Sequence, residues 1–187
     1  MDIGNTLYAA NRTEWREWLA ANFDKEKEIW LVYYNKKSRR PRIEYNEVVE
    51  EALAFGWIDS TVKKIDEFSS AQRFAPRNPK SGYSQANIER LRKLVEEGRV
   101  IPSVLAAVAP ILAKEFIFPP DIMAKIKANK IAWKNFRAFS PAYQRIRVGY
   151  VEGARSRSAE FQKRLANLIK KSENNKQFGF GGIEKYY

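Results

Sequence analysis

Residues 28–35, EIWLVYYN, are the most strand-like stretch of the chain, because aromatic and β-branched residues follow one another there without a helix breaker. A short, uninterrupted apolar run of this kind is typical of a strand that is covered on both faces. The stretch therefore predicts a buried strand, and the helical patterns around it indicate an α+β arrangement for the N-terminal part of the chain.

A helix is predicted on each side of this strand. The first begins at a Thr13 cap. The second runs from an Asn46 cap to about Phe55 and is stopped by Gly56, a residue type that suits a helix end. Both carry apolar residues three or four positions apart, which places them on one helix face. The predicted inner faces comprise Trp15, Trp18, Leu19, Val48, Val49, Ala52 and Leu53. A basic loop, KKSRRPR at residues 36–42, joins the strand to the second helix.

The next part of the chain mixes strands, loops and helices. Two short strands are expected around residues 67–70, followed by a loop at residues 76–82 and a helix that Ser84 caps. A small apolar helix at residues 102–114 and a linker at residues 116–120, FIFPP, come after it.

The C-terminal part of the chain is predicted to be helical throughout. We expect a break near Asn129, a helix start at Ser140-Pro141 and a last helix capped by Ser158. The predicted apolar stripes comprise Ile122, Ile126, Trp133, Phe136, Tyr143, Ile146, Tyr150, Phe161, Leu165 and Leu168.

These elements predict an α+β fold class. An N-terminal α+β domain with a few short strands spans residues 1–115, a small all-helical domain spans residues 116–173, and a flexible tail spans residues 174–187. No stretch approaches the ~18 apolar residues that a bilayer span requires, and the N-terminus does not resemble a signal peptide. The expected location is the cytoplasm.

The absence of cysteine and histidine removes whole classes of chemistry. Disulfides, zinc fingers, thiol nucleophiles, Ser-His-Asp triads and histidine general bases are all excluded. Any metal would need oxygen ligands only, and neither a metal site nor a cofactor is predicted. Acidic residues cluster at Glu44, Glu47, Glu50 and Glu51 around the start of the second helix, where they favour its dipole. A paired-carboxylate hydrolase would need two of them to converge in a cleft.

The chain carries 34 basic and 22 acidic residues, a formal net charge of +12. Most of this excess lies in residues 101–187, which hold 16 Lys and Arg against 6 Asp and Glu. Nucleic acid, an anionic membrane surface or an acidic protein are candidate partners, and a solvated basic surface without a dedicated partner is the alternative. Non-specific contact with nucleic-acid phosphates in this half would use Lys125, Lys134, Arg145, Arg147, Lys163 and Lys170. The oligomeric state is not predicted.

Two long motifs stand in register, ALAFGWIDS at residues 52–60 and RFAPRNPKSGYSQAN at residues 73–87. They resemble the YdeI/OmpD-associated family, often labelled bacteriocin-protection proteins, in which tryptophan is usual at the position of Tyr83. Phe136, Ser140, Pro141 and Arg145 also match a signature of the family's small helical domain. The resemblance extends over roughly residues 10–172, although residues 155–164 depart from the family pattern.

The resemblance implies a role in resistance to antimicrobial peptides and association with a porin, without a reaction. We accordingly expect a cytoplasmic binding or stress-resistance protein. An enzyme that acts on a phosphorylated or carboxylated small molecule, or a non-specific nucleic-acid-binding module, is the alternative.

The predicted ligand site lies between Gly56 and Asn87. Arg73 and Arg77 flank a proline-rich turn close to the N-terminus of the Ser84 helix, a combination that suits an anion. The predicted ligand-binding residues are Trp57, Asp59, Lys63, Asp66, Arg73, Arg77, Lys80, Ser81, Ser84 and Asn87. In this hypothesis Trp57 supplies a stacking face and an aspartate, Asp59 or Asp66, orients the ligand. If the protein is instead an enzyme, the candidate catalytic groups are Asp59, Lys63 and Asp66. Alternatively, Asp59 or Asp66 pairs with one of the two arginines and Trp57 belongs to the core.

Overall fold

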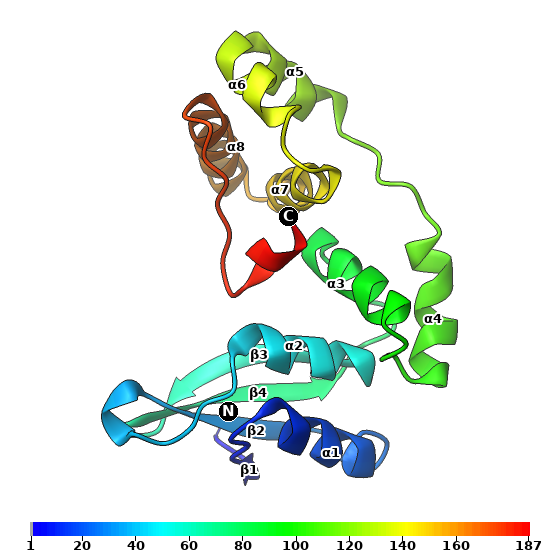
Figure 1. Ribbon diagram of the computed structural model, residues 1–187, viewed down its shortest axis with the longest axis vertical. Helices are drawn as coiled ribbons and strands as arrows, with labels where there is room; N and C mark the ends of the chain where they lie inside the picture. Colours follow the sequence, from blue (N-terminus) through cyan, green and yellow to red (C-terminus); the bar gives the residue numbers. More distant parts are fainter. Residues whose placement is uncertain (1) are drawn as a thin grey trace. The chain divides into compact units, whose positions relative to one another are not determined.

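The structure is a computed structural model that describes residues 2–187 (Figure 1). It divides into two compact units. Unit 1 comprises Met1–Gly82 and Lys93–Ala109, and unit 2 comprises Tyr83–Arg92 and Pro110–Tyr187. The division falls within two helices, α3 (Gln85–Glu96) and α4 (Pro102–Leu112), each of which contributes to both units.

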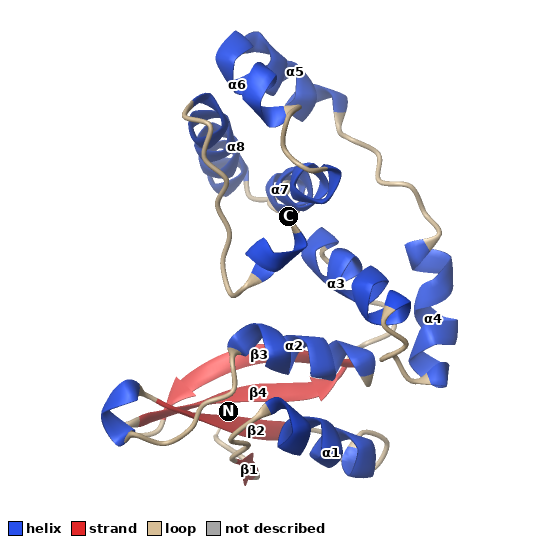
Figure 2. Cartoon of the chain, in the orientation of Figure 1, coloured by secondary structure: helices blue, strands red, loops and turns tan. Residues whose placement is uncertain are grey.

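Unit 1 is built on a four-stranded sheet with the order β1-β2-β4-β3 (Figure 2). The predicted strand at residues 28–35 is confirmed as β2 (Ile29–Tyr34). It pairs in parallel with β1 (Thr6–Leu7) and antiparallel with β4 (Ser69–Pro76). On the far side of β4 lies β3 (Trp57–Lys64), also antiparallel.

Two helices cover one face of this sheet. Ile29, Leu31 and Tyr33 alternate along β2 and pack in one core cluster with residues of α1 (Arg12–Asn22) and α2 (Tyr45–Ala54). Trp30 points to the opposite face and is also fully buried. The prediction that this strand is covered on both faces is therefore confirmed.

Several predicted boundaries shift. Asn11, not Thr13, caps α1, because its side chain accepts a hydrogen bond from the backbone N–H of Glu14 at 3.1 Å. Asn46 lies inside α2, where its amide donates to the Glu50 carboxylate. Gly56 does end the helix region, at a φ of +76° that favours glycine.

The two short strands predicted around residues 67–70 are wrong in extent. Those residues form the turn and the first positions of β4 in a long β3–β4 hairpin, in which Trp57 pairs with Pro76 and Lys64 with Ser70. Hydrophobic periodicity does not reveal β3, because most of its positions are half-buried or exposed and carry polar residues.

A network of ion pairs connects α1, α2 and the segment after α3 in unit 1. Glu50 and Glu51 of α2 are 1% and 0% exposed. Arg12 binds both, with Nη2 at 2.7 Å from Glu50 Oε2 and Nε at 2.5 Å from Glu51 Oε1. Arg16 Nη1 lies 2.6 Å from Glu51 Oε2, and Arg99 completes the network from the segment after α3.

Unit 2 is helical. After the first residues of α3 and the end of α4 it contains four further helices: α5 (Pro120–Ala128), α6 (Lys130–Phe136), α7 (Pro141–Glu152) and α8 (Ser158–Glu173). Asn129 caps α6 and Ser140 caps α7, as predicted from the helix break and the proline start. Arg157 precedes α8 without a side-chain cap, so the cap predicted at Ser158 is wrong by one residue.

The core of unit 2 follows most of the predicted stripes. Its buried residues include Ile122, Ile126, Phe136, Leu165 and Leu168. Tyr150 is the exception, with 45% of its surface exposed.

Glu89 of α3 joins α7 through a forked ion pair with Arg145. Arg145 Nε donates to Glu89 Oε1 at 2.7 Å and Nη2 donates to Oε2 at 2.9 Å. Burial alone would raise the pKa of Glu89, but hydrogen bonds from Arg145 and Gln85 and the charges of Arg145 and Arg92 outweigh it, so the pKa lies below its ordinary value.

The tail predicted to be flexible folds back within unit 2. Residues Ile183–Tyr186 form a 3-10 helix, η2, and Ile183 is only 3% exposed. The apolar and aromatic side chains of NNKQFGFGGIEKYY account for this packing, because it removes them from water.

We expect Glu51→Gln to lower the free energy of unfolding by about 3–5 kcal/mol, because it removes the charge that three guanidinium groups share in a buried place. Urea denaturation measures the change. Glu97→Gln is the matched control, since Glu97 contacts the same Arg99 from a side chain that is 40% exposed and should cost no more than ~1 kcal/mol. Equal losses in the two variants would contradict the structural role given to Glu51.

Because the pKa of Glu89 is lowered, the free energy of unfolding depends on pH in the acidic range. Its ion pair contributes fully above the ordinary pKa of 4.5, and the contribution is lost as the pH falls through the lower pKa of the folded protein. Glu89→Gln should therefore be less stable at pH 7, by about 2–4 kcal/mol, and lose less stability on acidification than the wild type. Denaturation at pH 7 and pH 3 measures this, and the exposed Glu96→Gln on the same helix should leave the profile unchanged.

Candidate functional site

The predicted ligand residues do not converge on one point. Asp59, Lys63, Asp66 and Arg73 lie along the β3–β4 hairpin, with Asp66 in its turn. Arg77, Lys80 and Ser81 follow the opposite end of β4, and Ser84 and Asn87 lie at the start of α3 in unit 2. The two ends of the hairpin are eight strand residues apart, so the turn cannot share a small ligand with the loop after β4.

Arg73 has a partner that the sequence did not indicate. Its Nε donates to Glu28 Oε2 at 2.8 Å and its Nη2 lies 2.7 Å from the same oxygen. The hydrogen bond from Arg73 holds the pKa of Glu28 below its ordinary value. The alternative that Arg73 pairs with Asp59 or Asp66 is wrong, because strand pairing brings Glu28, next to β2, beside Arg73 of β4.

The two aspartates serve the fold of the hairpin. Asp59 Oδ2 accepts hydrogen bonds from Tyr45 Oη at 2.9 Å and from Gln72 Nε2 at 2.8 Å. Asp66 Oδ1 accepts from the backbone N–H of Phe68 at 2.7 Å and from Ser69 Oγ at 2.9 Å. These bonds lower the pKa of Asp66, as expected for a carboxylate that closes a turn.

Trp57 does not offer a stacking face. It is 1% exposed, and its indole N–H donates to the Phe23 carbonyl at 3.0 Å. The alternative that placed Trp57 in the core is therefore confirmed. Lys63 is half-buried, with its Nζ 5.8 Å from the centre of the Trp30 ring.

Arg77 organises the loop after β4. Its backbone N–H donates to the Gly56 carbonyl at 2.9 Å, and its guanidinium donates to the carbonyls of Ser81 and Gly82. Lys80 is exposed beside it.

At the start of α3, Ser84 caps the helix as predicted, accepting from the backbone N–H of Asn87 at 3.3 Å. Asn87 in turn accepts from Arg90 at 3.1 Å. Anion binding by this set of residues stays a prediction.

A different group of cations gathers at the turn end of the hairpin. The loop at residues 36–42, which begins with the 3-10 helix η1 (Lys36–Ser38), is attached there by Asn35. The backbone N–H of Asn35 donates to the Phe68 carbonyl, and its side chain donates to the Glu67 carbonyl, both at 2.8 Å. We call this end the basic-loop surface. It comprises Lys36, Lys37, Arg39, Arg40, Arg42, Lys63, Lys64 and Phe68.

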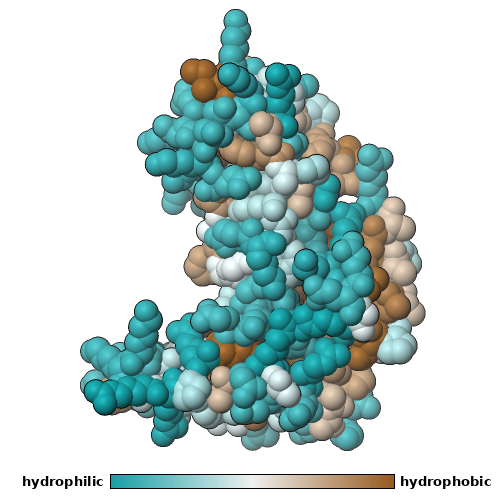
Figure 3. All heavy atoms as spheres, in the orientation of Figure 1, coloured by the Kyte–Doolittle hydropathy of each residue, from teal (hydrophilic) through white to brown (hydrophobic). Residues whose placement is uncertain are grey.

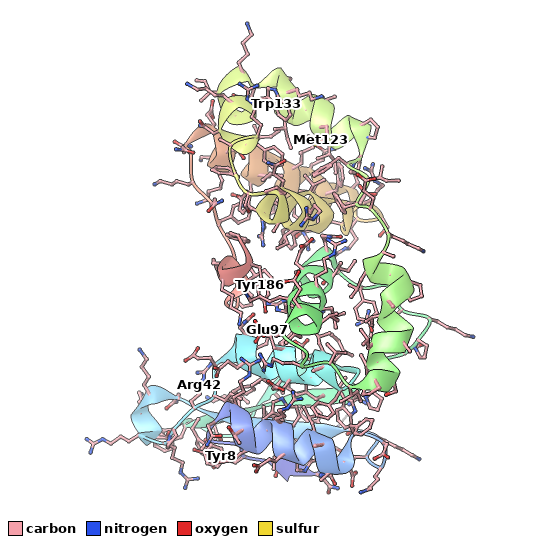
Figure 4. The ribbon with its side chains drawn as sticks, turned by 45° about the vertical axis from the view of Figure 1, so that its right-hand side comes forward. Tyr8, Arg42, Glu97, Met123, Trp133 and Tyr186 are labelled. Carbon is pink, nitrogen blue, oxygen red and sulfur yellow. The ribbon has the colours of Figure 1, made fainter. Side chains whose placement is uncertain are left out.

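The seven cations of the basic-loop surface make no ion pair within residues 2–187. Two of them stack on aromatic rings: the Arg40 guanidinium lies 4.4 Å from the Tyr34 ring centre, and that of Arg42 lies 5.5 Å from the Tyr33 ring centre. Hydrophilic side chains project from this end of unit 1 (Figure 3), where Figure 4 labels Arg42. The sequence revealed the charge of the loop but not its attachment to the hairpin turn.

Apolar side chains accompany these charges. Val62, Ile65 and Phe68 of the hairpin are 58%, 45% and 43% exposed. Exposed apolar groups among unpaired cations are typical of a surface that meets a partner.

The basic C-terminal half offers fewer free charges than its composition suggests. Arg145 is held by Glu89, and Arg147 is 7% exposed. Lys125, Lys134 and Lys163 are exposed on three different helices, α5, α6 and α8.

Within residues 2–187 no three acidic side chains gather closely enough to hold a metal ion. The helices of the described chain are too short or too polar to cross a membrane.

The fold is that of an α+β sheet unit joined to a helical unit that lies in the C-terminal part of the chain. The chain belongs to the family described as Domain of unknown function (DUF8412), which matches residues 7–107. Residues 115–175 match a second family, described as Bacteriocin-protection, YdeI or OmpD-Associated, so the resemblance found in the sequence is confirmed for this part. No curated protein and no solved structure matches the chain.

If Arg77 shapes its loop, Arg77→Ala should accelerate amide hydrogen exchange in residues 78–82, because two carbonyls lose their donor. Lys80→Ala removes a charge from the same loop and should leave that exchange unchanged. A loop that is equally protected in both variants would show that Arg77 does not hold it.

Proposed function

We propose that the protein is a non-catalytic binding protein whose partner is single-stranded nucleic acid, bound at the basic-loop surface. The observation that carries this proposal is the group of seven cations that have no ion pair within the described chain. Phosphates are the partner that such a group favours, since every phosphate neutralised releases counterions.

The ring of Phe68 favours a single strand over a duplex. It is 43% exposed, and its backbone carbonyl accepts the hydrogen bond that attaches the basic loop. Unpaired bases stack on exposed aromatic rings next to cations, whereas the bases of a duplex are already stacked on one another.

The position of the loop also supports binding. Asn35 joins it to the hairpin, and the stacking of Arg40 on Tyr34 and Arg42 on Tyr33 restricts two of its long side chains. Cations that are already ordered lose less conformational entropy when a strand binds.

The candidate catalytic groups support binding rather than turnover. Asp59 and Asp66 accept hydrogen bonds that maintain the hairpin, and Lys63 lies against Trp30. The family description, which speaks of protection from bacteriocins, names no reaction either.

The triple variant Lys36→Ala, Lys37→Ala, Arg40→Ala should bind an oligo-dT strand more weakly. Because each phosphate contact on a single strand contributes about 0.7 to the salt dependence, the slope of log K against log salt should fall by about 2. Fluorescence anisotropy at several salt concentrations measures it. The matched control, Lys125→Ala, Lys134→Ala, Lys163→Ala, removes the same charge from unit 2 and should retain the wild-type slope. Equal losses would mean that net charge alone attracts the strand.

Phe68→Ala tests the preference for a single strand. We expect about 1–3 kcal/mol less affinity for oligo-dT and little change for a duplex of equal length. If wild-type protein binds vesicles that contain phosphatidylserine, but no oligonucleotide at the same salt, the surface meets lipid and the proposal is wrong.

A further inference from the structure

Arg147 of α7 is a buried cation without a counterion. It is 7% exposed, and its side chain takes part in no ion pair or hydrogen bond within residues 2–187. Its Nε in particular is shielded from water and has no acceptor. Charged groups are rarely buried in this way unless a partner compensates them.

Aromatic rings surround the guanidinium but cannot satisfy it. Its Cζ lies 4.9 Å from the ring centre of Phe178, 5.6 Å from Tyr187, 5.7 Å from Tyr150 and 6.0 Å from Tyr143. Rings stabilise a cation placed over their faces. The N–H groups of a guanidinium point outward in its own plane, where they need oxygen acceptors.

A second unsatisfied donor stands one turn earlier on α7. Tyr143 is fully buried, and its hydroxyl O–H finds no acceptor within residues 2–187. The nearby Phe178 carbonyl already accepts from Tyr187 Oη at 2.6 Å. Burial raises the pKa of Tyr143 to about 12, against the opposing charge of Arg147 and a hydrogen bond from the Phe178 backbone, so the phenol keeps its proton and remains a donor at neutral pH.

The C-terminal segment covers these two groups. The Tyr187 ring packs edge-on against Tyr143 with ring centres 4.7 Å apart, and the Phe178 ring does so with ring centres 6.4 Å apart. The segment ends in η2, where Figure 4 labels Tyr186. Two of the four rings around Arg147, those of Phe178 and Tyr187, thus belong to the C-terminal segment.

We infer that Arg147 and Tyr143 form a binding site for a small carboxylate on an aromatic or apolar body, which enters beneath the C-terminal segment. Nε and one Nη of Arg147 form the fork that matches the two oxygens of a carboxylate. Tyr143 donates a third hydrogen bond, and the rings of the cage pack against the body of the ligand. The site shares no residue with the basic-loop surface, so either proposal can fail without the other.

Benzoate is a suitable probe and benzamide its neutral counterpart. Benzoate should raise the melting temperature of the wild-type protein in proportion to the logarithm of its concentration, while benzamide should not. Inorganic phosphate should have less effect than benzoate, because it lacks a body that packs against the rings. If benzoate fails to stabilise the protein, or benzamide stabilises it equally, the inference is overturned.

Substitutions test whether benzoate binds at Arg147 and Tyr143. Arg147→Gln should weaken benzoate binding roughly ten- to hundredfold in calorimetric titrations, and Tyr143→Phe, which preserves the packing, should weaken it about tenfold. Arg137→Gln removes an exposed charge from the same unit and should bind benzoate like the wild type. Should Arg147→Gln fail to fold, Tyr143→Phe decides alone: wild-type affinity in that variant would refute the site.

Discussion

Two consecutive carboxylates that are cut off from water, Glu50 and Glu51, are the constraint on which unit 1 depends. Ionised carboxylates that are buried in this way require cations as partners. Two segments far away in the sequence supply these cations: Arg12 and Arg16 lie on α1, and Arg99 follows α3. The network therefore joins three parts of the unit at one point of α2. Hydrogen-bonded ion pairs have directional geometry, so the network adds to the packed core in fixing the position of α1 relative to α2.

The elements that the sequence predicted well are those whose signal is local. The β2 run, the Ser140-Pro141 start and the break at Asn129 each depend on a few neighbouring residues, and all three occur in the structure. The ion pairs of Glu50 and Glu51 could not be predicted for the opposite reason. Glu50 and Glu51 resemble solvated residues near a helix start, and only the folded chain shows that arginines from distant segments reach them.

The candidate site was harder to predict, because its residues are neighbours in the sequence without being neighbours in space. An antiparallel hairpin carries successive residues away from each other, so Asp66 and Arg77 lie at opposite ends of it. It also brings in residues from elsewhere: Glu28 reaches Arg73 across the β2–β4 pairing. The attachment of the loop at residues 36–42 to the hairpin turn could not be predicted from the sequence either, since the two hydrogen bonds of Asn35 span more than thirty residues.

The order of the strands gives the charges of β3 a second consequence. β3 is an edge of the sheet, and the backbone groups on the outer side of an edge strand are open to pairing with another chain. Lys63 and Lys64 stand on that edge beside a register shift between Asp59 and Val62, which interrupts its regularity. Charge and irregularity both discourage a second molecule from extending the sheet. The same lysines thus disfavour the pairing of this edge with a strand of a second chain.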